Sequence, residues 1–447
     1  MITSSVADVR DIVVEDGVAW VATSGGLAAY DAGGKMLAVA RDLPSRDVKR
    51  VWPGPLVETA AGTFRWDEGW VAAEAPRVAV PLDLPGPPVD VAMVDGELRI
   101  ACVVAAVIVG ETRRELPIPA TAAGAVWGTM DGALVDDAGR RVGAVPGAVT
   151  AVAAVPGGWI VGTHAGTFRV TEDTRRLDSL WPDGDALCGN FVTGLARQDG
   201  TLVVGTFDGG ACRQTPSGWE VVPTPSPMVN DVAVVNGSLR IATAEGLVVD
   251  GVVYGEALDG KGAGLNHDGA NAISGDWVVD VLGPVRVSDW HRYRWHVSGH
   301  SYQVIAACPT GEIWAGSEDD GLAVSGVRFG RRNGRSSWRH VGMADGLPED
   351  WVMAVACAGK GAAWVGTYRN GVGRVDAKGW HPVAGLEDAW VQALATQGDT
   401  LWVGTADGLY AVENGVAREV AEEDVWTLLV EGDRVWAGTR TGIVEVR

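Results

Sequence analysis

A short strand-and-turn phrase, repeated through the whole chain, constrains the fold more than any other feature. Its clearest copy is Leu401-Trp402-Val403-Gly404-Thr405, followed by a tight turn at Asp407-Gly408. Similar copies place an anchor residue, usually threonine, at twelve points along the 447 residues. The anchors are Thr23, Thr59, Cys102, Thr129, Thr163, Thr206, Thr243, Val281, Ser317, Thr367, Thr405 and Thr439. A period of about 40 residues, built from short strands and glycine turns, is the signature of a β-propeller.

The repeat therefore predicts an all-β chain of about twelve four-stranded blades. Propeller rings usually have about four to eight blades, so we expect two six-bladed rings in tandem. Their boundary is predicted at the proline-rich segment 223–227, which gives a first propeller of residues 1–222 and a second of 223–447. One twelve-bladed ring is the alternative. The last blade lacks one outer strand, and the N-terminus would supply it. A single ring explains more simply why only one such strand is missing.

The conserved positions of the phrase have structural explanations. Strand alternation puts Gly404 on a blade face, where the absence of a side chain leaves room for a bulky residue of the adjacent blade. Five tryptophans share one register: Trp20, Trp314, Trp364, Trp402 and Trp436. They could form a stacking surface for sugars, but repetition inside a strand favours packing between blades.

Charge and cysteine content limit the classes of partner and compartment. The formal net charge is -21, which excludes nucleic acid and anionic membranes as main partners because both would be repelled. The five cysteines are odd in number and lack a CxxC spacing, so we expect scattered core residues in a reducing compartment. The sequence shows no export signal and no apolar run long enough for a membrane span. These features together predict a cytoplasmic protein.

One phrase between blades resembles a known family. Residues 346–352 read Gly-Leu-Pro-Glu-Asp-Trp-Val and precede Ala363-Trp364-Val365-Gly366-Thr367, and Asp42-Leu43-Pro44 and Gly385-Leu386-Glu387 echo the same phrase. This pattern is similar to the two-component-regulator propeller repeats. The resemblance implies propellers that commonly form the extracytoplasmic sensor half of membrane histidine kinases, often as tandem rings that bind ligand. The motif itself carries no catalytic residue, and this sequence shows neither a kinase nor a membrane span.

A recognition site is expected in the loops that lead into the inner strands, at one end of the channel. Aromatic, amide and carboxylate groups recur there without a fixed identity, which is typical of a binding surface. Turn capping by asparagine and aspartate is the alternative explanation, although it leaves the three tryptophans unexplained. The candidate residues are Asp47, Asn190, Phe191, Asn230, Asp231, Asn271, Tyr302, Trp351, Trp390 and Trp426. The predicted partner is a protein or a small ligand, in a sensor or scaffold role.

An enzyme is the second hypothesis. His267, His291 and His300 fall within one region and could support a metal-assisted hydrolase or lyase. The histidine spacing defines no metal-binding face in strands, and no GxSxG, HExxH, Walker A or dinucleotide motif occurs. We therefore predict a non-enzymatic protein without a metal or another cofactor.

Overall fold

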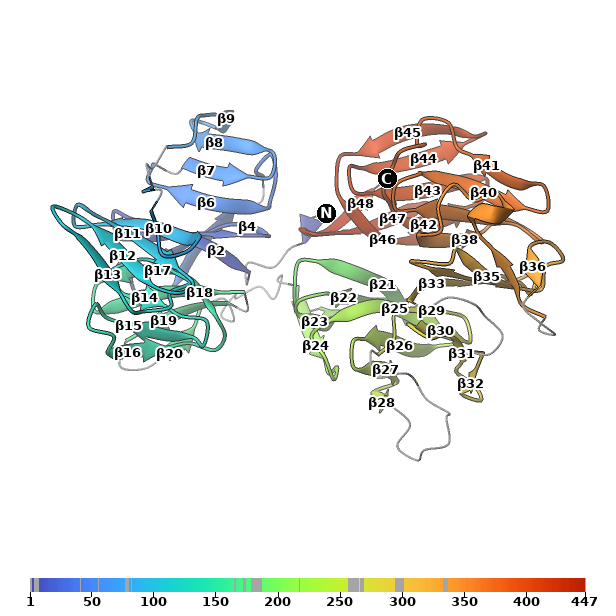
Figure 1. Ribbon diagram of the computed structural model, residues 1–447, viewed down its shortest axis with the longest axis horizontal. Helices are drawn as coiled ribbons and strands as arrows, with labels where there is room; N and C mark the ends of the chain where they lie inside the picture. The colour runs from blue at the N-terminus through green and yellow to red at the C-terminus, as the bar shows by residue number, and fades with distance from the viewer. Residues whose placement is uncertain are drawn as a thin grey trace. The chain divides into compact units, whose positions relative to one another are not determined.

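A computed structural model of the chain shows twelve antiparallel sheets (Figure 1). It describes residues 2–3, 8–40, 42–54, 56–76, 80–81, 83–164, 166–171, 174–177, 187–216, 218–255, 265, 269–293, 301–332 and 337–446. Within these ranges the only helix is a 3-10 turn at Met343–Asp345. Ten of the sheets have four strands, one has three and one has five, as a chain of propeller blades requires.

The first five sheets follow one another along the chain. Sheet 1 contains β2 (Val9–Glu15), β3 (Val18–Thr23), β4 (Gly26–Asp31) and β5 (Met36–Ala40); sheet 2 contains β6 (Val48–Trp52), β7 (Leu56–Thr59), β8 (Gly62–Trp66) and β9 (Trp70–Ala72). Sheet 3 contains β10 (Pro88–Val94), β11 (Glu97–Cys102), β12 (Ala106–Val109) and β13 (Arg113–Leu116); sheet 4 contains β14 (Trp127–Gly128), β15 (Ala133–Val135) and β16 (Arg141–Ala144). Sheet 5 contains β17 (Val149–Val155), β18 (Gly158–Thr163), β19 (Gly166–Val170) and β20 (Thr174–Arg176).

Seven more sheets complete the chain. Sheet 6 contains β21 (Val192–Gln198), β22 (Thr201–Thr206), β23 (Gly210–Thr215) and β24 (Gly218–Val222); sheet 7 contains β25 (Val229–Val235), β26 (Ser238–Thr243), β27 (Gly246–Val249) and β28 (Val252–Tyr254). Sheet 8 contains β29 (Ala272–Ser274), β30 (Trp277–Asp280), β31 (Gly283–Arg286) and β32 (His291–Arg292); sheet 9 contains β33 (Tyr302–Ala307), β34 (Ile313–Ser317), β35 (Leu322–Ser325), β36 (Arg331–Arg332) and β37 (Arg339–Val341). Sheet 10 contains β38 (Val352–Cys357), β39 (Ala363–Thr367), β40 (Val372–Asp376) and β41 (Gly379–Pro382); sheet 11 contains β42 (Val391–Gln397), β43 (Thr400–Thr405), β44 (Leu409–Glu413) and β45 (Val416–Ala421). Sheet 12 contains β46 (Val425–Glu431), β47 (Arg434–Thr439), β48 (Gly442–Val446) and β1 (Ile2–Thr3).

The chain forms two compact units whose boundary differs from the predicted one. The first comprises Ser4–Ala186 and contains sheets 1 to 5, and we call it the five-sheet unit. The second comprises Leu187–Arg447 together with Met1–Thr3, and we call it the seven-sheet unit. The division therefore lies 36 residues before the predicted boundary at 222/223, because sheet 6 packs with the later sheets. Five and seven sheets replace the expected six and six.

The glycine that precedes seven of the twelve anchors shows which sheets are neighbours. A methyl group placed on Gly404 would lie 2.6 Å from Cγ1 of Val425 in the next sheet, so this position has no room for a side chain. The same contact joins Gly162 of sheet 5 to Val9 of sheet 1, at 2.2 Å, and Gly438 of sheet 12 to Val192 of sheet 6, at 2.6 Å. The predicted role of the glycine is confirmed, and the first and last sheets of each unit contact each other.

The threonine anchor holds the turn that follows it. In sheet 11 the Oγ1 of Thr405 donates to the carbonyl of Gly408 and accepts the backbone N–H groups of Asp407 and Gly408. Equivalent bonds to the turn glycine are made by Thr23, Thr163, Thr206, Thr243, Ser317, Thr367 and Thr439. A side chain with one donor and two lone pairs can serve both partners, which explains why threonine or serine recurs here.

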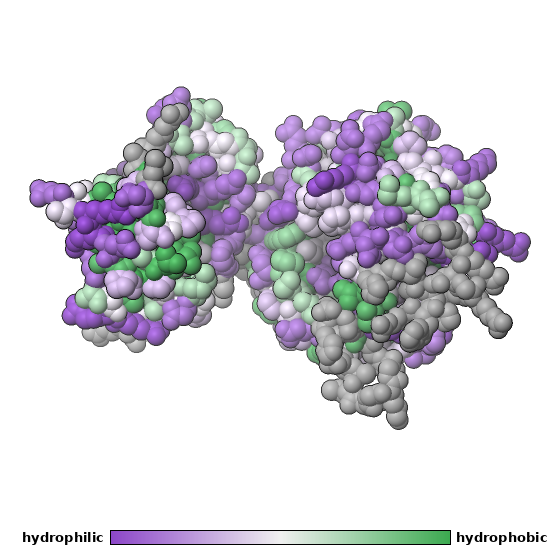
Figure 2. Space-filling model, viewed as in Figure 1, coloured by the Kyte–Doolittle hydropathy of each residue, from purple (hydrophilic) through white to green (hydrophobic). Residues whose placement is uncertain are grey.

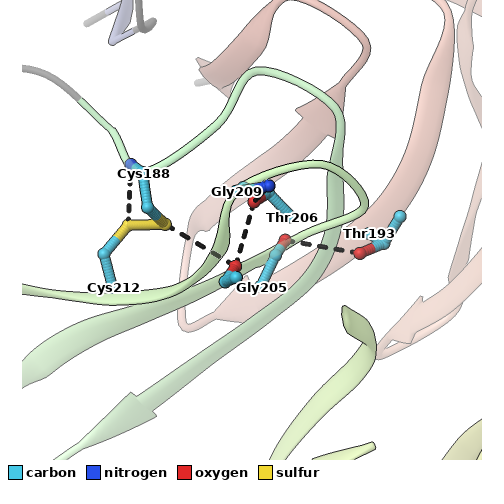
Figure 3. Close-up of a disulfide and its surroundings, with 7 residues drawn as sticks. Cys188, Thr193, Gly205, Thr206, Gly209 and Cys212 are labelled. Carbon is cyan, nitrogen blue, oxygen red and sulfur yellow. Dashed lines mark hydrogen bonds between the residues drawn. A yellow bond between two sulfur atoms is a disulfide. The ribbon is translucent and has the colours of Figure 1, made fainter. Parts of the chain in front are cut away.

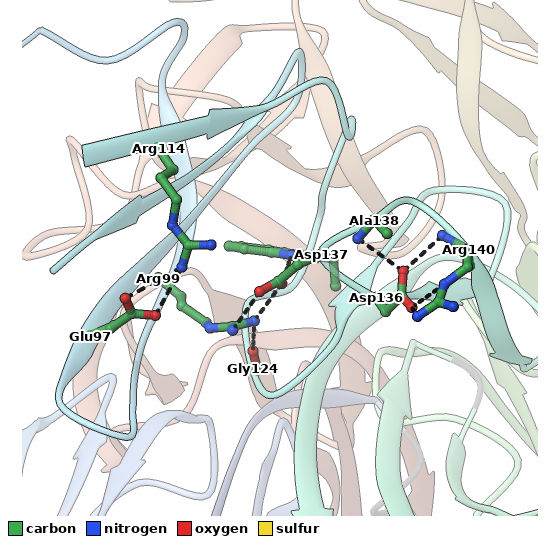
Figure 4. Close-up of polar contacts among 9 residues, drawn as sticks. Glu97, Arg99, Arg114, Gly124, Asp136, Asp137, Ala138 and Arg140 are labelled. Atoms are coloured by element: carbon green, nitrogen blue, oxygen red, sulfur yellow. Dashed lines mark hydrogen bonds and ion pairs between the residues drawn. The ribbon is translucent and has the colours of Figure 1, made fainter. Parts of the chain in front are cut away.

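The tryptophans of the repeated register pack between sheets, as predicted. Trp402 lies against Val425 and Ala437 of sheet 12, and Trp364 contacts the core that sheet 10 shares with sheet 11. In sheet 3 an arginine occupies this register. Arg99 donates to both carboxylate oxygens of Asp137, at 2.9 and 3.0 Å, and lies over the ring of Trp127 (Figure 4). The guanidinium group thus connects sheets 3 and 4 as a tryptophan does elsewhere.

Strand counts follow the spacing of the repeat. The short interval between the third and fourth anchors predicts a lost strand, and sheet 4 has only three strands, with an isolated bridge between Ala122 and Gly128. The long interval after Ser317 accommodates the fifth strand of sheet 9. Ile2 pairs with Val444, so the N-terminus completes the last sheet as expected. Figure 2 shows hydrophilic residues over much of the visible edge of each unit, with patches of hydrophobic residues between them.

Four of the five cysteines form disulfides, which corrects two predictions. Cys188 is joined to Cys212, with Cα atoms 5.8 Å apart (Figure 3). Cys308 is joined to Cys357, with Cα atoms 5.6 Å apart. Only Cys102 is a free, buried thiol. Disulfides persist in oxidising compartments. The prediction of a cytoplasmic, reduced protein is therefore wrong, and the two disulfides indicate an extracellular or periplasmic protein.

Candidate functional site

One backbone hydrogen bond defines an equivalent end in most of the sheets. The residue directly before the first buried residue of the inner strand occupies what we call the leading position. The residue directly after the anchor occupies the trailing position, and its N–H donates to the carbonyl of the leading residue. These pairs are Ser24 to Asp8, Ala60 to Asp47, Phe207 to Phe191, Ala244 to Met228, Glu318 to Ser301, Tyr368 to Trp351 and Ala406 to Trp390. The two positions form the rim where ligands of propellers are expected.

Aromatic side chains form a continuous row on the rim of the seven-sheet unit. The ring of Trp351 stacks on Tyr368, with centroids 4.2 Å apart, and Tyr368 meets Trp390 edge to face at 5.0 Å. Trp390 lies 6.0 Å from Trp426, and Trp426 lies 4.7 Å from Phe191. Phe191 in turn contacts Phe207, which is 40% exposed. We call these six rings the aromatic rim; it extends over sheets 10, 11, 12 and 6.

Two arginines lie against this rim. The guanidinium carbon of Arg369 is 4.9 Å from the centroid of Tyr368. That of Arg440 is 4.9 Å from Trp426 and 5.1 Å from Phe191, and its Nε is 2.6 Å from a carboxylate oxygen of Asp424. Cations over aromatic faces hold those rings in place and cover part of their surface.

Two predicted asparagines bind the neighbouring sheet. The Nδ2 of Asn230 donates to the carbonyl of Ala270, and the Nδ2 of Asn271 donates to the carbonyl of Tyr302, both at 2.7 Å. Asn190 is almost fully buried before sheet 6, and Tyr302 is buried in sheet 9. Burial, together with Asp320 and Asp319, raises the pKa of Tyr302. In this structure Asn230 and Asn271 use their amide donors to connect neighbouring sheets, and Asn190 and Tyr302 are buried.

Asp231 is a half-buried residue whose carboxylate also joins two sheets. Its Oδ1 accepts the N–H of Val232 and its Oδ2 accepts the N–H of Ile273, each at 2.8 Å. Burial raises its pKa to about 7 against the lowering effect of these two donors. Asp90 of the five-sheet unit bonds Val91 and Ala123 in the same way, and burial raises its pKa to about 7 as well.

These carboxyls predict that the protein is more stable in mild acid. Because the folded-state pKa lies above the unfolded value near 3.8, the folded protein holds protons that the unfolded chain releases. The contribution is present below about pH 4 and is lost as the pH rises to about 7, amounting to about 4 kcal/mol at most for each carboxyl. We expect a higher Tm at pH 5 than at pH 8 by calorimetry. Asp231→Asn should reduce this difference, and an unchanged pH dependence would contradict the assignment.

Asp47 lies apart from the other candidates, in the five-sheet unit. Its Oδ1 is 3.8 Å from a nitrogen of Arg10, which binds Asp8 at 2.9 Å. Asp8 also lies 2.7 Å from Nδ1 of His164, which belongs to sheet 5. The rim positions of this unit therefore carry a charged network, in contrast to the aromatic rim of the other unit.

The histidine hypothesis receives no support from the described residues. His291 is exposed, and its ring lies 4.5 Å from that of Tyr293. His267 and His300 lie outside the described residues. In the part of the chain that the structure describes, no three His, Cys, Asp or Glu side chains are grouped as metal ligands. Nor does any helix in that part have the length and hydropathy needed to cross a membrane.

The structure thus brings four of the ten predicted residues, Phe191, Trp351, Trp390 and Trp426, into one row. Sequence reasoning missed Tyr368 and Phe207, which complete the row, and the two arginines beside them. The signal was present: Tyr368 and Phe207 each follow an anchor threonine directly, at the trailing position. Attention to both positions of each rim pair would have identified them.

Comparison with known proteins gives structural likenesses only. No family model matches the chain, and no curated protein matches it. Similar solved structures include the extracellular domain of the putative hybrid two component system BT4673 from B. thetaiotaomicron, at 14% identity and a TM-score of 0.49, covering 98% of this chain and 69% of that one. Another similar structure is PorZ, a bacterial surface component of the type-IX secretion system of Porphyromonas gingivalis, at 14% identity and a TM-score of 0.49, covering 98% and 73%. BamB from Moraxella catarrhalis has 13% identity and a TM-score of 0.38, covering 66% and 92%.

Proposed function

We propose that the chain is a non-enzymatic recognition protein built from a five-bladed and a seven-bladed propeller. The ring assignment is supported by the glycine–valine contacts, which join Gly162 to Val9 and Gly438 to Val192 just as they join consecutive sheets. An ion pair between Arg197 and Glu431, at 2.6 Å, also connects sheets 6 and 12.

The aromatic rim is the observation that carries the proposed binding function. Six rings from four sheets gather at one end of the seven-sheet unit, although the leading and trailing pairs of sheets 1, 2, 7 and 9 contain no aromatic residue. Aromatic residues supply large, rigid contact area and are enriched in binding surfaces. In this proposal the rim binds a protein or a small ligand, and the protein acts as a sensor or a scaffold.

Alanine at Trp351, Trp390 and Trp426 tests this proposal. We expect the triple variant to lose binding of the native partner by 100-fold or more, about 3 kcal/mol, because such anchors dominate binding energy. Because each ring packs on its neighbours, some loss of Tm is also expected. Affinity capture from the native source, followed by titration of the captured partner, is the measurement.

The matched control is Trp66→Ala. Trp66 is 47% exposed and lies on β8 of the five-sheet unit, outside the rim. It should bind as the wild-type protein does. If the triple variant folds, by circular dichroism, and keeps full affinity, the aromatic rim is not the binding surface.

A further inference from the structure

In most sheets the residue after the first buried residue of the inner strand lies on a β-bulge, and we call this the bulge position. In sheets 6 and 7 its side chain donates to the carbonyl of the next sheet: Thr193 to Val229 and Asn230 to Ala270. In the five-sheet unit Thr150 donates to Val9 in the same way. In these three sheets the polar side chain at the bulge position is satisfied by the adjacent sheet.

Gln392 departs from this rule. It occupies the bulge position of sheet 11 and is only 7% exposed. Neither its Oε1 nor its Nε2 has a hydrogen-bond partner among the described residues. Leaving both ends of a buried carboxamide unsatisfied is costly, so the site is built for a partner that supplies one acceptor and one donor.

The tryptophans beside Gln392 present the same kind of unfilled group. Trp390 lies two residues before Gln392, directly ahead of β42, and Trp426 holds the bulge position of sheet 12. The Nε1 groups of Trp351, Trp390 and Trp426 are all buried and lack an acceptor within the described part of the chain. Outside the rim, Trp402 donates to Gln397 at 2.9 Å, whereas the Nε1 groups of Trp70, Trp314 and Trp436 are likewise buried without an acceptor among the described residues. An indole N–H can only donate, so three acceptors are required from outside.

The exposed chemistry of the rim favours carbonyl groups over flat stacking ligands. One face of Trp351 is covered by Tyr368, and Arg369 lies over Tyr368. Arg440 lies over Trp426. The ring edges carry partial positive charge and attract acceptors, and the N–H groups on these edges are buried without an acceptor among the described residues.

We propose that the aromatic rim binds an extended peptide, whose backbone amides pair with Gln392 and whose carbonyl oxygens accept the indole N–H groups. A secondary amide offers one acceptor and one donor, the complement of a carboxamide, and an extended chain repeats both along its length. Apolar side chains of the peptide pack on the surrounding rings. This inference rests on the proposed recognition function and specifies the class of ligand.

Gln392→Leu separates this inference from a structural role. Leucine fills a similar volume without polar atoms, so the variant should be more stable, with a Tm higher by about 2–4 °C. Its affinity for a bound peptide should fall about tenfold because the amide pairing is lost. The matched control is Gln303→Leu, the same substitution at the bulge position of sheet 9, which lies outside the aromatic rim.

The probe is a surface array of hexapeptides with acetylated and amidated ends, beside an array of neutral oligosaccharides. Blocked ends exclude binding through a terminal charge. Binding of peptides by the wild-type protein and by Gln303→Leu, with about tenfold weaker binding by Gln392→Leu, supports the proposal. Binding of oligosaccharides alone, equal peptide binding by Gln392→Leu, or binding to neither array overturns it. Loss of native-partner binding in the triple tryptophan variant would still support the rim itself, so the two proposals fail separately.

Discussion

Replacing Gly162 by alanine is expected to destabilise the five-sheet unit by about 2–3 kcal/mol while leaving the seven-sheet unit intact. The added methyl group would lie 2.2 Å from Cγ1 of Val9, and both residues are held in strands of a closely packed core. Overpacking of this kind forces the sheets apart, because neither backbone can move alone. Hydrogen exchange should increase in residues 8–177, and exchange in 187–446 should stay unchanged.

Gly438→Ala is the reciprocal variant, since its methyl group would meet Val192 of sheet 6 at 2.6 Å. Its effect should be confined to the seven-sheet unit. Gly86→Ala is a suitable control, because the only nearby atom is the tip of the exposed Val104 side chain, at 3.2 Å. Faster exchange in the seven-sheet unit after Gly162→Ala would show that sheets 1 and 5 are not neighbours.

Loss of the Cys308–Cys357 disulfide is the second large effect that we expect. The bond connects the ends of β33 and β38 and closes a segment of 49 residues. In the chain-entropy account, a loop of this length contributes about 4 kcal/mol. The Cys308→Ser, Cys357→Ser double variant should therefore unfold at lower denaturant concentration within residues 187–446.

The five-sheet unit serves as an internal reference for this measurement. Both disulfides lie in the seven-sheet unit, and the five-sheet unit contains the free thiol of Cys102. Reduction of the wild-type protein should weaken protection against exchange in 187–446 alone. If reduction lowered the protection against hydrogen exchange equally in both units, the disulfides would not be stabilising the seven-sheet unit alone.

The repeat predicts the blades well because one local phrase encodes each of them. Thr405, Gly404 and Trp402 act within a blade or on the adjacent one, so their roles are readable from spacing and strand alternation. The distribution of blades between units depends instead on whether Gly162 meets Val9 or Val192. Val9 and Val192 hold the same position of the repeat, at the start of an inner strand, so the sequence alone does not show which of them Gly162 contacts.

The candidate site shows a similar limit. Trp351 and Trp390 stand out in the sequence, but the continuous row depends on Tyr368, which joins them across sheets. The predicted Asn230 and Asn271 carry groups suited to recognition, yet the neighbouring sheets already use them. The cysteines mislead for the same reason: strand topology, rather than a short spacing, brings Cys188 to Cys212.

The pairing of β1 with β48 has a consequence for the order of events during synthesis. Residues 4–186 contain every strand of the five-sheet unit, so this part can reach its native contacts as soon as it leaves the ribosome. Sheet 12 remains incomplete until the final strand, Gly442–Val446, has been made and has met Ile2–Thr3. Ile2–Thr3 are thus made before the whole five-sheet unit but find their partner strand only after the polypeptide between them has been made.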